Sequence, residues 1–247
     1  MAKLYVVGIG PGNYENMTIR ADRALQESDV IIGYNVYVDL VKDRYPDKEF
    51  MTTPMTKEAL RCQIAVDKAK EGKTTSMICS GDSGIYGMAA LVYEIRGEET
   101  EPEIEVIPGL TAAASGASIL GAPLTHDFAV ISLSDRLTPW EKIEERLRAA
   151  SKADLSIVLY NPVSKGRPDH LKKACDIMLE NLPESRICGI ARNIGREGES
   201  MRVLTLKELK DADCDMFCTV FIGNAMTKVL DSKMVTPRGY REVNDGR

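Results

Sequence analysis

The stretch Leu4-Tyr5-Val6-Val7-Gly8-Ile9-Gly10-Pro11-Gly12 opens the chain with a short apolar strand that runs directly into a glycine-rich loop. A dinucleotide-binding fold would have a third glycine at position 13 and a helix beginning there. Here Asn13 fills that position, Pro11 stiffens the loop, and the next helix start is Thr18. A helix that begins so late cannot hold a phosphate in the usual way. The stretch instead predicts a tight backbone loop at the carboxyl end of a strand, where open α/β sheets bind ligands.

Short apolar segments alternate with helical patterns along the rest of the chain. Thr56 is expected to cap a helix that ends near Gly72, Thr138 to cap one with Pro139 in its first turn, and Pro168 to open a third. This alternation is typical of α/β proteins with mainly parallel sheets. The expected strands are Leu4–Ile9, Val30–Gly33, Thr75–Cys79, Glu103–Ile107, Ala129–Leu133, Ser156–Tyr160, Arg186–Arg192, Arg202–Leu206 and Phe217–Ile222.

A segment rich in glycine, alanine and proline, residues 116–125, lies near the midpoint of the 247 residues. We therefore expect a domain boundary there, with residues 1–120 and 121–247 forming two αβα domains and a ligand cleft between them. A chain of this length buries roughly 70–75% of its unfolded surface, so folding requires neither a metal nor a disulfide. The polar segment after Pro237 is expected to be loosely held.

The composition is that of an ordinary globular enzyme, with 44% hydrophobic and 28% charged residues. The formal charge of -5 argues against general binding of nucleic acid or anionic membranes. The longest apolar runs are too short for a membrane span or a secretory signal, so a cytoplasmic location is expected. The six cysteines are scattered, and with only His126 and His170 as histidines no metal site is expected.

A second loop, Ser80-Gly81-Asp82-Ser83-Gly84-Ile85-Tyr86-Gly87, follows the strand that ends at Cys79. Gly-Asp-Ser-Gly also occurs around the nucleophile of trypsin-like proteases, but that site needs an upstream histidine and both histidines here lie downstream. The glycines favour close approach of the backbone to a ligand. Asp82 could accept a hydrogen bond from that ligand or cap the following helix, and both interpretations stay open.

A third strand ends in Val106-Ile107-Pro108-Gly109, followed by a small-residue helix that contains Thr111 and Ala112. By itself this segment indicates only close packing. Because all three loops follow strands of the same half, they could together line one pocket.

The three loops together resemble the tetrapyrrole methylase family, and the resemblance covers almost the whole chain. Segments of the C-terminal half are similar to the ring-contracting members of the family, the precorrin-3B C(17)-methyltransferases and cobalt-factor III methyltransferases. The segments that carry this narrower resemblance are Ser80–Ala89, Leu124-Thr125-His126-Asp127-Phe128, Ser132-Leu133-Ser134-Asp135, Leu159-Tyr160-Asn161-Pro162 and Arg192–Glu199.

The resemblance implies that S-adenosylmethionine binds in a folded conformation between the two domains, largely through backbone groups, and leaves as S-adenosylhomocysteine. Small and apolar residues in the matching positions suit a ligand that the main chain contacts. The cofactor-binding residues implied are Gly10, Pro11, Ser80, Gly81, Asp82, Ile85, Tyr86, Thr111, Ala112, Tyr160, Asn161, Asn193 and Ile194.

The implied substrate is a tetrapyrrole with many carboxylates, which basic side chains in the C-terminal half would bind. The candidates are Lys165, Arg167, Arg192 and Arg196. Methyl transfer needs alignment rather than an enzyme nucleophile, whereas ring contraction also needs proton movement and lactone formation. Candidates for that acid–base work are His126, Asp135 and Glu197, for each of which capping or ion pairing is an equally open role.

The expected activity is thus methylation of carbon 17 of precorrin-3B or cobalt-factor III with ring contraction, in cobalamin biosynthesis. Alternatives are methylation of another precorrin carbon or of uroporphyrinogen III, and, outside the family, a nucleotide-binding module without methyl transfer. The motifs fit a cobalt-containing and a metal-free substrate alike, and the first is slightly favoured because no oxygenase segment is fused. A homodimer is expected from the family.

Overall fold

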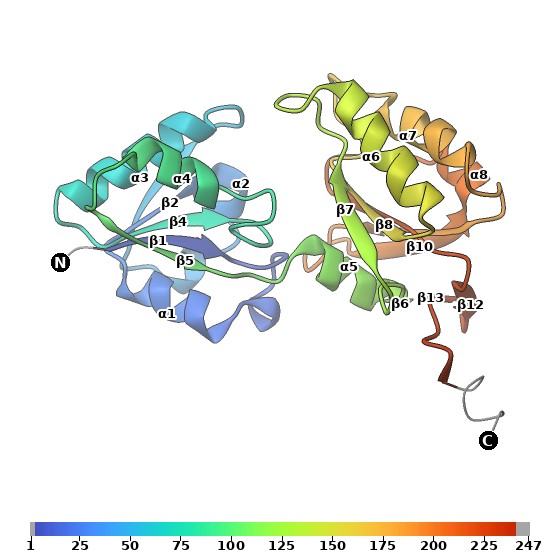
Figure 1. Cartoon of the computed structure of the whole chain (residues 1–247). Coiled ribbons are helices and arrows are strands. Elements are labelled where there is room, and N and C mark those ends of the chain that lie inside the picture. Colours follow the sequence, from blue (N-terminus) through green and yellow to red (C-terminus); the bar gives the residue numbers. More distant parts are fainter. Residues whose placement is uncertain (1–2, 241–247) are drawn as a thin grey trace. The chain divides into compact units, whose positions relative to one another are not determined.

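The computed structural model describes residues 3–240, and the chain divides into two compact units, Met1–Ala112 and Ala113–Arg247 (Figure 1). The first unit is built on a parallel β-sheet and the second on a mixed β-sheet, and helices cover both faces of each sheet. The α/β class and the two αβα domains predicted from the sequence are confirmed. The division falls after residue 112, earlier than the boundary expected after residue 120, because the helix between these positions packs on the second sheet.

The first unit contains a five-stranded sheet in the order β3-β2-β4-β1-β5, and every pair in it is parallel. Four of its strands were predicted. The fifth, β3, has the sequence Glu-Phe-Met-Thr-Thr and lies at the sheet edge with its residues mostly half-buried or exposed, so it lacks the apolar run of a buried strand. The strands are β1 Lys3–Gly8, β2 Val30–Tyr34, β3 Glu49–Thr53, β4 Thr75–Cys79 and β5 Glu103–Ile107.

Helices cover both faces of this sheet. One apolar core lies between the sheet and the helices α3 and α4, and a second lies between the sheet and α1 with the segment around α2. Thr18 caps α1, since its side chain accepts a hydrogen bond from Ala21 N at 3.1 Å. The predicted Thr56 cap is wrong: Thr56 has a φ of 72° and lies before Lys57, the residue that flanks α3. The helices are α1 Ile19–Glu27, α2 Asn35–Val38, α3 Glu58–Lys70 and α4 Ala89–Arg96.

The second unit contains a five-stranded sheet in the order β10-β9-β11-β8-β7. Only β7 and β8 pair in parallel; the other pairs are antiparallel. The prediction of mainly parallel sheets is therefore wrong for this unit. The reason is that the connection between β9 and β10, residues 193–199, is too short for a crossover helix. The strands are β7 Phe128–Ser132, β8 Ser156–Tyr160, β9 Ile187–Arg192, β10 Ser200–Thr205 and β11 Cys218–Ile222.

The two faces of the second sheet are covered by different helices. Alternate residues Cys218, Val220 and Ile222 of β11 pack into the core beneath α6 (Trp140–Lys152), α7 (His170–Leu179) and α8 (Leu206–Leu209). The opposite face carries α5 (Ala112–Leu120), where Gly116 lies against Phe221 of β11. The predicted Thr138 cap is wrong, because Pro139 rather than Thr138 flanks the first helical residue, Trp140.

A small third sheet joins the end of α5 to the C-terminal segment. Its strands β6 (Gly121–Ala122), β13 (Lys233–Val235) and β12 (Lys228–Leu230) are too short for a sequence pattern to predict. The segment after Pro237 was expected to be loosely held; Arg238 donates to Thr125 O at 2.8 Å, and residues 241–247 lie outside the described part.

Candidate functional site

Three loops meet at the carboxyl edge of the first sheet, where the adjacent strands β4, β1 and β5 end. The loop after β1 and the loop after β4 are joined by a pair of backbone hydrogen bonds, Gly10 N to Gly81 O at 3.1 Å and Gly81 N to Gly10 O at 2.7 Å. The loops after β4 and β5 are joined by Ser83, whose Oγ donates to Ile107 O at 2.8 Å. Hydrogen bonds thus join the three loops that were expected to line one pocket.

Glycine is required where the loops touch. A Cβ atom on Gly109 would lie 2.1 Å from Gly81 O and 2.6 Å from Gly8 O, and one on Gly8 would lie 2.6 Å from Gly109 N. The atoms that such a Cβ would meet belong to the backbone of neighbouring loops and strands, so they cannot shift as a flexible side chain could. The glycines of this region therefore serve contact between main chains, and the main chains form the floor of the loop cluster.

Asp82 holds the loop cluster together. Its Oδ1 accepts hydrogen bonds from Gly84 N at 2.7 Å and Ile85 N at 2.9 Å, and its Oδ2 accepts one from Gly109 N at 2.9 Å. The helix-capping interpretation is wrong, because α4 begins only at Ala89, after Met88. Both carboxylate oxygens already accept backbone hydrogen bonds, so Asp82 shapes the loops in which the predicted cofactor-binding residues lie.

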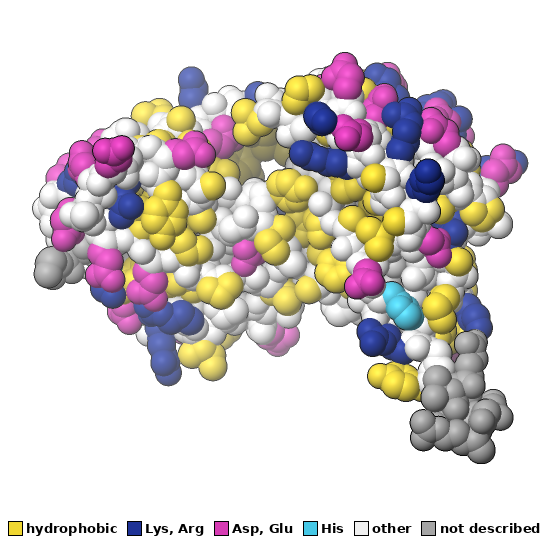
Figure 2. All heavy atoms as spheres, viewed as in Figure 1, with side chains coloured by type: hydrophobic (Ala, Val, Ile, Leu, Met, Phe, Trp, Pro, Cys, Tyr) yellow, Lys and Arg dark blue, Asp and Glu magenta, His cyan; other side chains and the backbone are white. Residues whose placement is uncertain are grey.

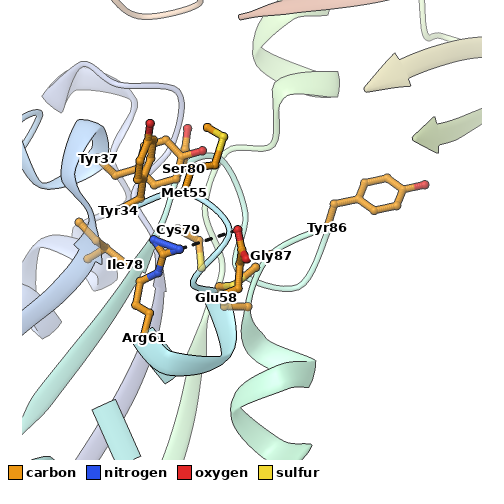
Figure 3. Close-up of a pocket in the computed structure, with 11 residues that line it drawn as sticks. Tyr34, Tyr37, Met55, Glu58, Arg61, Ile78, Cys79, Ser80, Tyr86 and Gly87 are labelled. Atoms are coloured by element: carbon orange, nitrogen blue, oxygen red, sulfur yellow. Dashed lines mark ion pairs between the residues drawn. The ribbon is translucent and has the colours of Figure 1, made fainter. Parts of the chain in front are cut away.

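The loop cluster also presents apolar surface. Ile85 is 44% exposed and Tyr86 is 54% exposed, and Figure 3 shows the Tyr86 ring pointing away from the other residues drawn. Pro11, by contrast, is buried, and Ala112 is the first residue of α5. Main-chain donors and acceptors beside exposed apolar side chains suit a small ligand with polar ends and an apolar body. The residues present thus fit S-adenosylmethionine.

The second sheet also gathers its predicted residues at one edge. Because β11 is antiparallel to both β8 and β9, and β7 is parallel to β8, the carboxyl ends of β7, β8 and β9 lie together. Asn161 and Asn193 follow β8 and β9 with φ values of 55° and 52°, a left-handed backbone that asparagine tolerates. Asn161 Nδ2 donates to Ser132 Oγ at 3.0 Å, which joins the loops after β7 and β8.

Two further predicted cofactor residues contact α5. The hydroxyl of Tyr160 accepts a hydrogen bond from Ala113 N at 2.7 Å, so Tyr160 satisfies one of the free amides at the start of that helix. Ile194 is buried, and its side chain packs on Gly116. Both residues therefore position the first turns of α5 in the second unit.

At the same edge, Asp135 and His170 form a hydrogen-bonded pair of titratable groups. Asp135 Oδ2 lies 3.2 Å from His170 Nε2, and Asp135 Oδ1 lies 3.9 Å from Arg167 Nη1. The ring of Trp140 packs edge-on against His170, with ring centroids 4.6 Å apart. Among the described residues, His170 Nδ1 and Arg167 Nη1 are buried with no hydrogen-bond partner. This Asp135–His170 pair can hold and move a proton.

His170 was not singled out as a catalytic candidate. The spacing of apolar residues could have placed His170 on the buried face of its helix, because His170, Ala174 and Met178 are four residues apart and all are buried. This helix follows a loop at the edge of the sheet. A buried imidazole at its start is therefore a candidate for a site at that edge.

The Asp135–His170 pair predicts a specific dependence of stability on pH. Burial raises the pKa of Asp135, but the hydrogen bond from His170, the charge of His170, a backbone hydrogen bond and Arg167 together outweigh it, so the net pKa lies below the ordinary value of 3.8. A carboxyl with a depressed pKa stabilises the fold above its unfolded pKa and ceases to do so as the pH falls through the folded pKa.

We therefore expect Asp135→Asn to lower the melting temperature from neutral pH down to about pH 5, with the difference from wild type shrinking as the solution is acidified further. Circular dichroism melts across this range measure it. Asp47→Asn, on an exposed loop of the first unit, is the control. A destabilisation by Asp135→Asn that is independent of pH would contradict the prediction.

The other acid–base candidates lie elsewhere. His126 precedes β7 whereas Asp135 follows it, so the two lie at opposite ends of a strand about 17 Å long. His126 Nε2 donates to Pro237 O at 2.9 Å, which anchors the C-terminal segment. Glu197 is exposed on the loop between β9 and β10. The structure thus does not bring His126 together with Asp135.

The predicted basic residues differ in what they contact. Arg192 is already engaged: its Nη2 donates to Asp213 O at 2.9 Å, and its Nε donates to Cys218 Sγ at 3.3 Å. The Arg196 guanidinium lies 5.9 Å from the ring centroid of Phe217. Lys165 is exposed, while Arg167 belongs to the Asp135 group. Lys165 and Arg196 lie on the loops that follow β8 and β9, at the edge where these strands end.

On the face drawn in Figure 2, acidic and basic side chains are interspersed over α6, where Lys142 pairs with Glu145 and Arg148 with Glu144. Among the described residues, no helix combines the length and the apolar character needed to cross a bilayer.

Comparison with known proteins gives one consistent result. The sequence model of the family described as Tetrapyrrole (Corrin/Porphyrin) Methylases matches residues 3–210. The chain is 44% identical to the probable cobalt-factor III C(17)-methyltransferase of Salmonella typhimurium, over 96% of this chain and 99% of that protein. It is 45% identical to the cobalt-factor III methyltransferase of Priestia megaterium, over 97% of this chain, but spans only 45% of that longer protein. The crystal structure of the methyltransferase CobJ superposes with a TM-score of 0.89 at 33% identity, covering 96% of this chain and 100% of that one.

Proposed function

The chain belongs to the tetrapyrrole methylase family, and from this premise we propose that it methylates carbon 17 of cobalt-factor III or precorrin-3B with ring contraction, in cobalamin biosynthesis. The methyl donor in this proposal is S-adenosylmethionine. The similarity to the Salmonella relative along its full length supports carbon 17 over another carbon of the macrocycle or uroporphyrinogen III.

The observation that carries the proposal is the cluster of three hydrogen-bonded loops at the carboxyl edge of β4, β1 and β5. Gly10, Gly81 and the Asp82 turn present main-chain groups there, and Ile85 supplies exposed apolar surface. S-adenosylmethionine supplies a methyl group on a positively charged sulfur, which a carbon nucleophile can accept directly. The protein's work is then orientation, which can lower a barrier by roughly 7–11 kcal/mol.

Ring contraction asks more of the protein than methyl transfer, since protons must move. In this proposal His170 Nε2 and Asp135 Oδ2 share a proton, and the partly exposed Asp135 carboxylate exchanges that proton with the macrocycle. Arg196 and Lys165 bind acid groups of the macrocycle at the same edge of the second sheet. The Asp135–His170 pair replaces His126 as the favoured acid–base candidate.

Two titrations and one reaction test the proposal. S-adenosylhomocysteine should bind and NAD should not, when each is titrated calorimetrically into the whole chain. Incubation with S-adenosylmethionine and cobalt-factor III, or precorrin-3B, should then give a product heavier by one methyl group with a changed visible spectrum. Binding of NAD instead would favour the nucleotide-binding module, and methylation at another carbon would contradict the carbon-17 assignment.

Arg196→Ala should weaken binding of cobalt-factor III about tenfold or more while leaving the affinity for S-adenosylhomocysteine unchanged, because the lost guanidinium pairs with a carboxylate of the acceptor. Titration of the variant with each ligand measures the two affinities separately. Equal loss of both affinities, or loss of neither, would contradict the assignment of Arg196.

We also propose that the enzyme is a cytoplasmic homodimer; the resemblance to the family implies the dimer. Light scattering on the purified chain tests the dimer: a mass near twice 27.2 kDa is expected, and a mass near 27.2 kDa at all concentrations would contradict it.

A further inference from the structure

A pocket lies within the first unit, beside the loop cluster and over the carboxyl ends of β2 and β4. Its cavity volume is about 110 Å³. Residues from α2, α3 and the loops after β3 and β4 surround it (Figure 3). Its lining includes Tyr34, Tyr37, Glu58, Arg61, Cys79 and Ser80.

The pocket contains a buried positive charge. Arg61 in the first turn of α3 is only 4% exposed, and Figure 3 shows its guanidinium directed into the pocket. Among the described residues, Arg61 Nε has no hydrogen-bond partner. Glu58 Oε1 approaches Nη2 only to 4.0 Å, beyond hydrogen-bond distance, and its own side chain is 39% exposed. Since a buried guanidinium N–H without an acceptor is unfavourable and Glu58 pairs with Arg61 only at 4.0 Å, the site is suited to receive an anion at Arg61.

The anion that pairs with Arg61 would come from a bound ligand. Burial raises the pKa of the Cys79 thiol to about 11, so Cys79 is neutral near pH 7 and does not neutralise the guanidinium. Tyr34, whose ring centroid lies 5.9 Å from the Arg61 guanidinium carbon, packs edge-on against Tyr37. A planar guanidinium bordered by phenol rings suits a carboxylate, which can accept two parallel N–H bonds.

The position of the pocket favours one source of that carboxylate. In the sheet order β3-β2-β4-β1-β5, the three loops proposed to bind S-adenosylmethionine follow β4, β1 and β5. The Arg61 pocket lies over β2 and β4. The loop after β4 borders both, and Ser80 is common to the two sets. A molecule bound in the pocket therefore lies next to the donor rather than on it.

We propose that Arg61 binds a carboxylate side arm of the tetrapyrrole acceptor and so fixes which edge of the macrocycle faces the methyl donor. The proposal rests on the proposed function. The alternative source of the same chemistry is the methionyl carboxylate of the donor itself, and the experiment below separates the two.

The test compares Arg61→Met with Arg23→Met, which replaces an exposed arginine of α1. Arg61→Met should bind cobalt-factor III about 30-fold or more weakly, with unchanged affinity for S-adenosylhomocysteine. Its melting temperature should equal or exceed that of wild type, because methionine fills the space without a buried charge. Arg61→Lys, which keeps the charge but not the fork, should recover only part of the affinity.

A second measurement does not depend on the enzyme's reaction. Sodium propionate should raise the melting temperature of wild type above that in sodium chloride of equal ionic strength, and should not do so for Arg61→Met. Propionate stabilisation without any binding of cobalt-factor III would keep the carboxylate site and overturn its tetrapyrrole ligand. Wild-type binding of cobalt-factor III by Arg61→Met, or loss of S-adenosylhomocysteine binding instead, would overturn the proposal while leaving the proposed function intact.

Discussion

Gly109→Ala should reduce the affinity for S-adenosylhomocysteine about 100-fold or more. The added Cβ would lie 2.1 Å from Gly81 O and 2.6 Å from Gly8 O, well inside van der Waals contact. Both neighbours are backbone atoms of strands or of the loops that end them, so relief requires a whole loop to move. Overpacking of this kind costs typically 1–3 kcal/mol and sometimes more, and here the displaced atoms are those that would contact the ligand.

Isothermal titration with S-adenosylhomocysteine measures the effect, and a thermal melt shows how much of it accompanies loss of the fold. The matched control is Gly166→Ala, because a Cβ at Gly166 meets nothing within 4 Å. It should bind S-adenosylhomocysteine as wild type does. If Gly109→Ala bound the ligand as tightly as Gly166→Ala, the three-loop cluster would not be the donor site.

The convergence of these loops could be predicted because each carries its own local signal. An apolar strand that ends in glycines at Gly8, Gly81 or Gly109 specifies a loop, and parallel strands bring their carboxyl ends to one edge. The role of Asp82 could not be predicted in the same way. Its partner Gly109 lies 27 positions along the chain, and only the pairing of β1 with β4 and β5 brings the two loops together.

In the second sheet, sequence periodicity predicts the strands but not their directions. The strands of β8, β9 and β11 were predicted, but apolar runs of five or six residues carry no information on direction. The direction is set by the connections, and the short link from β9 to β10 imposes an antiparallel turn. The edge that gathers Asn161 and Asn193 follows from that arrangement rather than from the strands themselves.

Two residues with proposed functional roles could not be singled out from the sequence, because each lies on the buried side of an ordinary helix. Arg61 and His170 occupy the first turns of α3 and α7, on the buried side, where a sequence pattern leads one to expect an apolar residue. Each has a buried polar atom with no hydrogen-bond partner among the described residues, Nε of Arg61 and Nδ1 of His170. That property depends on every neighbour in space and is visible only in the fold.

Asp82→Asn should lower the affinity for S-adenosylhomocysteine at least about tenfold and the melting temperature by at least about 3 °C. The carboxylate accepts three backbone hydrogen bonds, from Gly84 and Ile85 on one oxygen and from Gly109 on the other. An amide side chain has only one acceptor oxygen, so its NH2 group must face at least one backbone N–H. A hydrogen bond to a charged acceptor contributes about 1.5–3 kcal/mol, and its replacement by two opposed donors loses at least that much.

The control is Asp43→Asn, which makes the same change of charge at an exposed position of the first unit. Titration with S-adenosylhomocysteine and a thermal melt of both variants measure the two effects side by side. Since Asp82 shapes the loops rather than contacting a donor on the ligand, Asp82→Ala should be at least as damaging as Asp82→Asn. A ligand affinity for Asp82→Asn equal to that of Asp43→Asn would mean that the donor binds without the Gly109 loop held in place. If Asp82→Asn lost affinity for the ligand but kept the wild-type melting temperature, Asp82 would be a residue that contacts the ligand directly.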